Sequence, residues 1–180
     1  MNYKNRILLF ILIAVIFSLA AVLHAEEQQL NEQQIKSAII YNIARYVTWP
    51  ATTLNNGQSF TVGIFGQGHN VSQWGGLQGK TVYGRKINVR RFTDLDELAN
   101  CQLVFIESSE RKNVLRILAI LKDYSVLTIS EIEGFSHYGG MIALRVVNNR
   151  MTFEINLKSA RASGLDISSN LLKLATEVIK

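Results

Sequence analysis

Cysteine is nearly absent from this sequence, because Cys101 is the only one among 180 residues. A single cysteine excludes a disulfide bond within the chain and leaves too few thiolates for a cysteine-based zinc site. It could still pair with a second chain, or act as a nucleophile beside a histidine that meets it in space. Cys101 precedes the apolar run QLVFI, where a free cysteine behaves as a small buried hydrophobe. We therefore expect a buried, inert thiol.

Histidine is also scarce, since only His69 and His137 lie outside the first 25 residues. Neither has a partner at the spacing of a metal motif, so the sequence predicts no metal site. Gly63, Gly66 and Gly68 match neither the dinucleotide fingerprint nor the P-loop, and we expect only a tight turn there. Without a catalytic constellation, the sequence predicts a binding or regulatory protein that is not an enzyme and needs no cofactor.

Long runs of a single charge are missing as well. The chain has 19 basic and 14 acidic residues, and two of the basic ones fall within residues 1–25, so the remainder carries a net charge of +3. Basic and aromatic residues are not interleaved, which argues against nucleic acid as a partner.

The one long apolar run extends from Ile7 to Leu23 and follows two basic residues. A positive start followed by an apolar stretch is typical of a secretory signal peptide, here with Ala25 as its last residue. We predict a signal peptide over residues 1–25 and one domain over residues 26–180. An uncleaved membrane anchor is the alternative, because a run of 17 residues approaches the length that spans a bilayer.

An amphipathic helix is the first strong pattern after this run. It should end at Trp49 and Pro50, because proline disfavours helical geometry in the residue before it. Its apolar residues recur at helical spacing and predict the buried face. They are Ile35, Ile39, Ile43, Tyr46 and Val47.

Short apolar runs predict strands at residues 60–65, 102–106 and 126–129. An amphipathic helix between the last two completes a βαβ unit with parallel strands. Residues 141–147 and 151–157 predict a hairpin, because Asn148 and Asn149 tolerate the geometry of its turn.

Alternation in the second hairpin strand predicts that Glu154 and Asn156 point outward. A final helix is expected to begin at Asp166 or Ser168 and to bury Val178. Together the patterns predict an α/β fold: a single three-layer domain with a mixed, mainly parallel β-sheet flanked by helices and a C-terminal β-hairpin.

Six segments carry a resemblance to a known family. They are YNIARYVTWP at 41–50, TVGIFG at 61–66, CQLVFI at 101–106, VLTIS at 126–130, GFSHYGGMIAL at 134–144 and FEINLKSARASGLDISSNLLKLA at 153–175. In order and spacing, they resemble the YfiR family of exported regulators across nearly the whole predicted domain.

The resemblance implies a periplasmic protein without enzymatic activity that forms a homodimer. It implies binding to the periplasmic sensor region of an inner-membrane diguanylate cyclase, a GGDEF protein, which lowers cyclic di-GMP and biofilm formation. An OmpA-like outer-membrane lipoprotein would relieve the inhibition. Described members carry disulfides that bear on stability and redox response, so the single Cys101 is a departure that puts redox control in doubt.

Two stretches at helix ends are candidates for a contact surface. They supply Arg45, Thr48 and Trp49 at the end of the first helix, and Asp166 and Ser168 at the start of the last. Trp49 is equally consistent with core packing, because tryptophan is highly buried on average. The alternative function is an extracytoplasmic sensor domain that binds a small ligand near Trp49 and Pro50 and acts on another membrane signalling protein.

Overall fold

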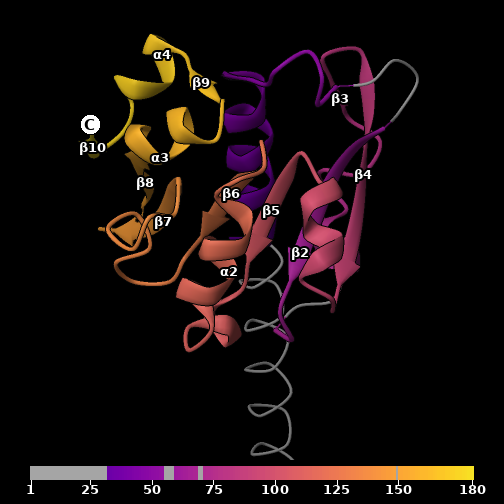
Figure 1. The fold of residues 1–180 in the computed structure, drawn as a ribbon, viewed down its shortest axis with the longest axis horizontal. Helices are drawn as coiled ribbons and strands as arrows, with labels where there is room; N and C mark the ends of the chain where they lie inside the picture. Colours follow the sequence, from indigo (N-terminus) through magenta and orange to yellow (C-terminus); the bar gives the residue numbers. More distant parts are fainter. Residues whose placement is uncertain (1–31, 55–58, 69–70, 149) are drawn as a thin grey trace, which may run out of the picture.

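The computed structural model describes residues 32–54, 59–68, 71–148 and 150–180 (Figure 1). The signal peptide predicted for residues 1–25 lies outside these ranges. The described residues form a mixed α/β fold with an eight-stranded, mostly parallel sheet, four α-helices and a separate two-stranded ribbon. None of the helices in these ranges is long and apolar enough to cross a membrane.

The large sheet has the strand order β10-β8-β7-β6-β5-β2-β4-β3. Neighbouring strands are parallel, except for the antiparallel pairs β7–β8 and β3–β4. The strands are β2 (Phe60–Phe65), β3 (Thr81–Val82), β4 (Arg85–Phe92), β5 (Leu103–Ile106), β6 (Leu127–Ser130), β7 (Ile142–Val147), β8 (Arg150–Asn156) and β10 (Glu177–Ile179).

Helices and short 3-10 turns connect these strands. One α-helix occupies residues 32–45. The others are α2 (Val114–Leu121), α3 (Leu157–Ala162) and α4 (Ser169–Leu172), and the 3-10 turns are η1 (Val71–Trp74), η2 (Asp96–Asn100) and η3 (Ser108–Glu110).

Two groups of buried apolar residues cover the two faces of the sheet. In β5, Leu103 and Phe105 pack in the group that includes the helix over residues 32–45, whereas Val104 and Ile106 pack in the group that includes α2. Strands that are apolar at every position are typical of a parallel sheet, because helices cover it from both sides. The predicted mainly parallel sheet, with helices against it, is therefore present.

The N-terminal helix is turned relative to its predicted buried face. Ile43 and Val47 are buried and Ile39 is half-buried, but Ile35 is 47% exposed and Tyr46 is 42% exposed. The prediction was therefore wrong for Ile35 and Tyr46.

Lys36 takes the buried place that apolar spacing assigned to Ile35. Its side chain is only 2% exposed, and its ammonium group lies 2.9 Å from the Glu131 carboxylate and 3.4 Å from that of Glu32. A buried lysine needs a charged partner, because removing an unpaired ammonium group from water is costly. Glu131 is distant in sequence, so local periodicity could not reveal this arrangement.

The predicted βαβ unit and the predicted strand pair are both present. β5 and β6 are parallel with Leu103 opposite Leu127, and α2 connects them. β7 and β8 are antiparallel and meet at a turn where Asn148 has a φ of +50°. The chain continues beyond this hairpin through α3 and α4 to β10, which adds a further strand beside β8.

The outward orientation predicted for Glu154 and Asn156 is wrong. Each residue is only 7% exposed, because residues 131–140 fold over this part of β8. Ser136 in that segment donates a hydrogen bond to the Glu154 carboxylate at 2.5 Å and accepts one from the Asn156 amide at 2.8 Å.

The predicted final helix is shorter than its pattern suggested. Ser168 caps α4 as expected, since its hydroxyl oxygen accepts a hydrogen bond from the Leu171 amide at 3.4 Å. The helix ends at Leu172, however, and Val178 lies in strand β10. Pairing with β8 therefore overrides the helical spacing of these apolar residues.

The buried Lys36 predicts a difference between two substitutions. Glu131→Ala leaves the ammonium group without its closest partner and should lower the free energy of unfolding by about 2–3 kcal/mol. Lys36→Met replaces the charge with an apolar side chain of similar length and should cost less than about 1 kcal/mol. Urea denaturation measures both, and Glu133→Ala, at a carboxylate that is 78% exposed, is the control. Equal losses for Glu131→Ala and Lys36→Met would contradict the pairing.

Candidate functional site

The structure brings the two predicted contact stretches together in one ribbon. β1 (Val47–Thr48) and β9 (Asp166–Ile167) pair antiparallel, with Thr48 opposite Asp166. The Ser168 amide extends the pairing by donating to the Tyr46 carbonyl at 2.9 Å. Residues from the two ends of the domain therefore form a single surface.

Trp49 directly follows β1 and is buried next to this ribbon. It is only 4% exposed, and its indole N–H donates to the Gln102 carbonyl at 3.0 Å. Its ring meets Phe60 edge-on with centroids 5.2 Å apart, and it meets Tyr83 edge-on at 6.3 Å. Trp49 thus packs in the core, whereas Arg45, Thr48 and Asp166 are exposed and Ser168 is half-buried.

Tyr83 is a surface residue beside the ribbon that the sequence did not single out. It is 49% exposed, and its hydroxyl donates to the Val47 carbonyl at 2.6 Å. Tyr83 and Gly84 both have positive φ, at 51° and 71°, which is the geometry of a tight turn between β3 and β4. We call the exposed side chains here the β1–β9 surface. They are Arg45, Tyr46, Thr48, Tyr83 and Asp166.

Cations gather on one aromatic ring at the edge of this surface. The Arg45 guanidinium lies 5.6 Å from the centroid of the Tyr41 ring, and the Lys80 ammonium lies 4.7 Å from it. Both distances fall within the range of cation–π attraction. The Tyr41 hydroxyl also donates to the Thr81 carbonyl at 3.2 Å, which holds the ring in place.

A second candidate ligand site is the edge of the sheet at the carboxyl ends of β2 and β5. The connection from β2 to β4 contains η1, which packs with one apolar group, whereas the connection from β5 to β6 contains α2, which packs with the other. The two connections leave in opposite directions and over opposite faces. Such a topological switch point is where open α/β sheets bind ligands.

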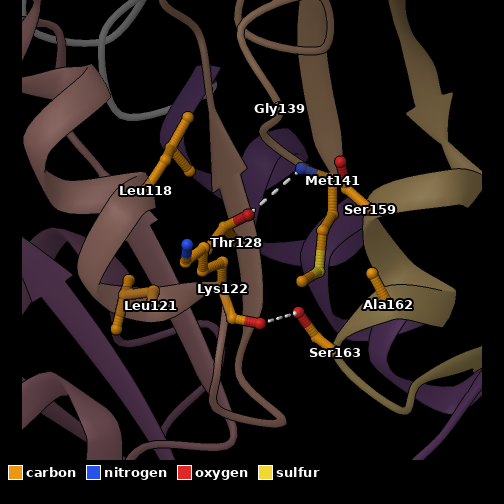
Figure 2. Close-up of a pocket in the computed structure, with 9 residues that line it drawn as sticks. All are labelled: Leu118, Leu121, Lys122, Thr128, Gly139, Met141, Ser159, Ala162 and Ser163. Carbon is orange, nitrogen blue, oxygen red and sulfur yellow. Dashed lines mark hydrogen bonds between the residues drawn. The ribbon is translucent and has the colours of Figure 1, made fainter.

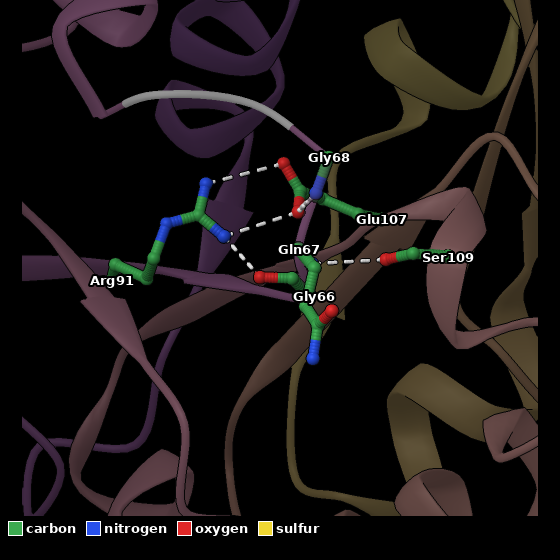
Figure 3. Close-up of polar contacts among 6 residues, drawn as sticks. All are labelled: Gly66, Gln67, Gly68, Arg91, Glu107 and Ser109. Carbon is green, nitrogen blue, oxygen red and sulfur yellow. Dashed lines mark hydrogen bonds and ion pairs between the residues drawn. The ribbon is translucent and has the colours of Figure 1, made fainter.

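Glu107 occupies this switch point (Figure 3). Its side chain is only 1% exposed, and its carboxylate accepts a hydrogen bond from the Gly68 amide at 2.6 Å. The Arg91 guanidinium, at the end of β4, pairs with the same carboxylate at 3.1 Å. Arg91 also donates to the Gly66 carbonyl.

The neighbouring amide of the turn is satisfied in the same way, because the Gln67 N–H donates to the Ser109 hydroxyl oxygen at 3.0 Å. Gly66 has a φ of +131°, and a Cβ there would lie 2.7 Å from that of Glu107, so this position requires glycine. The predicted tight turn is therefore confirmed. Amide groups that could receive an anion are engaged by the protein's own side chains, which makes the switch point a structural clamp.

A small pocket lies between α2, β6 and α3 (Figure 2). Its volume is about 90 Å³. Binding pockets for drug-sized molecules are several-fold larger, at roughly 300–1,000 Å³. The residues lining it are Leu118, Leu121, Lys122, Thr128, Gly139, Met141, Ser159, Ala162 and Ser163, and they do not include the corner at Trp49 and Pro50 where the sensor alternative places a ligand.

Cys101 is buried, as the sequence predicted, and only 1% of it is exposed. Burial raises the pKa of the thiol to about 12, and the nearby Arg90 offsets this only in part. The thiol is therefore neutral at physiological pH, whereas nucleophilic and redox chemistry require the thiolate. His69, one of the two histidines considered as a partner for Cys101, lies outside the residues that the structure describes.

In the described residues, the amides of Gln67 and Gly68 at the switch point are satisfied by the protein's own side chains, and the β1–β9 surface exposes tyrosine and charged side chains. A family model described as YfiR/HmsC-like matches residues 33–176, so the chain belongs to the YfiR/HmsC-like family. This family is regulatory, and membership points to a periplasmic regulator of cyclic di-GMP signalling.

The buried thiol should be protected from chemical modification. Near pH 8, we expect an aromatic disulfide reagent to label native Cys101 at least about a hundredfold more slowly than the unfolded chain, because so little thiolate is present. Absorbance of the released thiolate measures both rates. Rapid labelling of the native protein would contradict the burial of this thiol.

The raised pKa of Cys101 also predicts how the stability depends on pH. The contribution of this thiol to the free energy of unfolding is constant below about pH 8.5 and falls as the pH rises toward 12.

The switch-point clamp predicts an induced anion site. Glu107→Ala removes the carboxylate that pairs with Arg91 and should lower the free energy of unfolding by about 3 kcal/mol. Sulfate should restore part of this loss, because it can accept hydrogen bonds from the same guanidinium and amide groups. Urea denaturation with and without sulfate measures the effect. The wild type and Glu133→Ala set the general effect of the salt, and an equal gain in all three proteins would rule out the induced site.

Proposed function

We propose that this protein binds the periplasmic sensor region of an inner-membrane diguanylate cyclase and holds the cyclase inactive, which lowers cyclic di-GMP and biofilm formation. Membership of the YfiR/HmsC-like family over residues 33–176 carries this proposal. The closed switch point and the neutral thiol support a role without catalysis.

The proposed contact is the β1–β9 surface together with Ser168. Arginine and tyrosine are enriched at interfaces, because each combines a large contact area with a polar group. Arg45, Tyr46 and Tyr83 provide such side chains beside the ribbon, and Asp166 adds the opposite charge. Buried Trp49 keeps the backbone beneath them rigid, which reduces the entropy lost on binding.

Inhibition by such a contact requires selectivity between two arrangements of the cyclase. A binder shifts an equilibrium only by the difference between its affinities for the two states. The β1–β9 surface would therefore fit the inactive arrangement of the sensor region better than the active one.

Several further elements belong to the same proposal. Residues 1–25 act as a signal peptide that delivers the protein to the periplasm, and the regulator works as a homodimer. An OmpA-like outer-membrane lipoprotein sequesters it and so releases the cyclase. The exposed side chains of Ile35, in the N-terminal helix, and Tyr46, directly after it, leave apolar area for such contacts.

Deletion of the gene should raise cellular cyclic di-GMP several-fold and increase biofilm formation. The wild-type gene should reverse both effects, whereas the triple variant Arg45→Ala, Thr48→Ala and Asp166→Ala should not. All three side chains are exposed, so the variant should fold and accumulate normally. Quantification of the nucleotide by mass spectrometry, with immunoblotting of the variant, tests this expectation.

The matched control is the triple variant Lys112→Ala, Arg116→Ala and Asp123→Ala. These charged residues are equally exposed but lie on and around α2, against the opposite face of the sheet. The control should complement fully. Unchanged cyclic di-GMP on deletion would refute the proposed function, whereas failure of both variants would refute only the assignment of the surface.

A further inference from the structure

Two carboxylates lie side by side on the edge of the sheet. β10 runs parallel to β8, and Glu177 is directly opposite Glu154 in their register. His137 completes the group, since one ligand atom from each of these three residues lies within 4.8 Å of the others. Sequence spacing could not predict this, because the three side chains come from a loop and two strands.

Hydrogen bonds from the residue before His137 hold the loop against β8. The Ser136 hydroxyl donates to Glu154 at 2.5 Å, and the Ser136 carbonyl accepts from the Asn156 amide at 2.8 Å. His137 itself points its Nε2 toward Glu177, with 3.5 Å between nitrogen and oxygen. The three side chains are thus positioned by the fold, and Glu154 in particular is only 7% exposed.

The charges of this group are not balanced. Like charges directly opposite each other on neighbouring strands are destabilising. Arg145, from β7, pairs with Glu154, whereas within the part of the chain that the structure describes Glu177 pairs with the imidazole of His137. An ionised carboxylate has about four acceptor positions, so Glu154 can bind Arg145 and Ser136 and still coordinate an ion.

We propose that His137, Glu154 and Glu177 bind a divalent transition metal ion, with Zn²⁺ as the best fit. One imidazole nitrogen and two carboxylate oxygens are donors that zinc accepts, whereas Mg²⁺ and Ca²⁺ prefer oxygen alone. Because His137 is 54% exposed and Glu177 is 46% exposed, water completes the coordination. Arg145 and Ser136 orient the buried carboxylate, as second-shell partners do at metal sites.

The ion ties three segments together. β10 has three residues, and among the strands that the structure describes it pairs only with β8, so few backbone contacts hold it to the sheet. A metal bridge from Glu177 to Glu154 and His137 fixes this strand and the loop at the same edge. Metal supply thereby sets the order of the C-terminal strand.

The test uses the purified protein, free of any polyhistidine tag and stripped with EDTA. Calorimetric titration with Zn²⁺ should show one saturable site, and Mg²⁺ should show none at the same concentration. His137→Ala and Glu177→Gln should each weaken zinc binding at least about tenfold. Both side chains are about half exposed, so these variants should fold.

Hydrogen exchange gives an independent readout. Zinc should slow exchange of the Val178 amide in the wild type and leave it unchanged in His137→Ala. Glu133→Gln, an exposed carboxylate in the same loop, should behave like the wild type in both measurements. Absence of saturable zinc binding, or equal affinity in the wild type and both ligand variants, would overturn the site whatever the outcome for the cyclase.

Discussion

The two-sided burial of the parallel strands is the constraint on which this structure depends. β2 and β5 lie in the middle of the sheet, and both carry apolar side chains toward both faces. Neither strand can form stably until helices exclude water from each side. The N-terminal helix covers one face and α2 the other, so the chain must place these two helices before any surface site acquires a fixed geometry.

Much of this framework could be predicted from the sequence, because it rests on local patterns. The apolar run at 102–106, the helix after it and the next strand form a βαβ unit by simple spacing, and β7 and β8 pair antiparallel at the two strand patterns. Prediction failed where a polar group is buried through a distant partner. Lys36 depends on Glu131, and Glu154 depends on Ser136, and no periodicity within one segment can show such pairings.

The same division applies to the candidate sites. Helix ends and caps drew attention to Arg45, Thr48, Asp166 and Ser168. The β1–β9 pairing places Thr48 opposite Asp166, with Arg45 and Ser168 close to them in sequence. Trp49 was ambiguous because its ring could pack or bind, and its burial assigns it to the core. Glu107 and Arg91 were missed because each is an ordinary charged residue at a strand end, and only the order of strands brings them together.

The β1–β9 ribbon has a consequence for how the chain reaches its native state. It joins Val47 to Ile167, so the first part of the domain remains without its partner until nearly the whole chain is available. Contacts between residues so far apart in sequence carry a large entropic cost of loop closure and form slowly. A chain that is synthesised from its N-terminus therefore leaves the residues around Trp49 incompletely covered at first. Pairing of β1 with β9 is a late step that completes the fold and the proposed contact surface together.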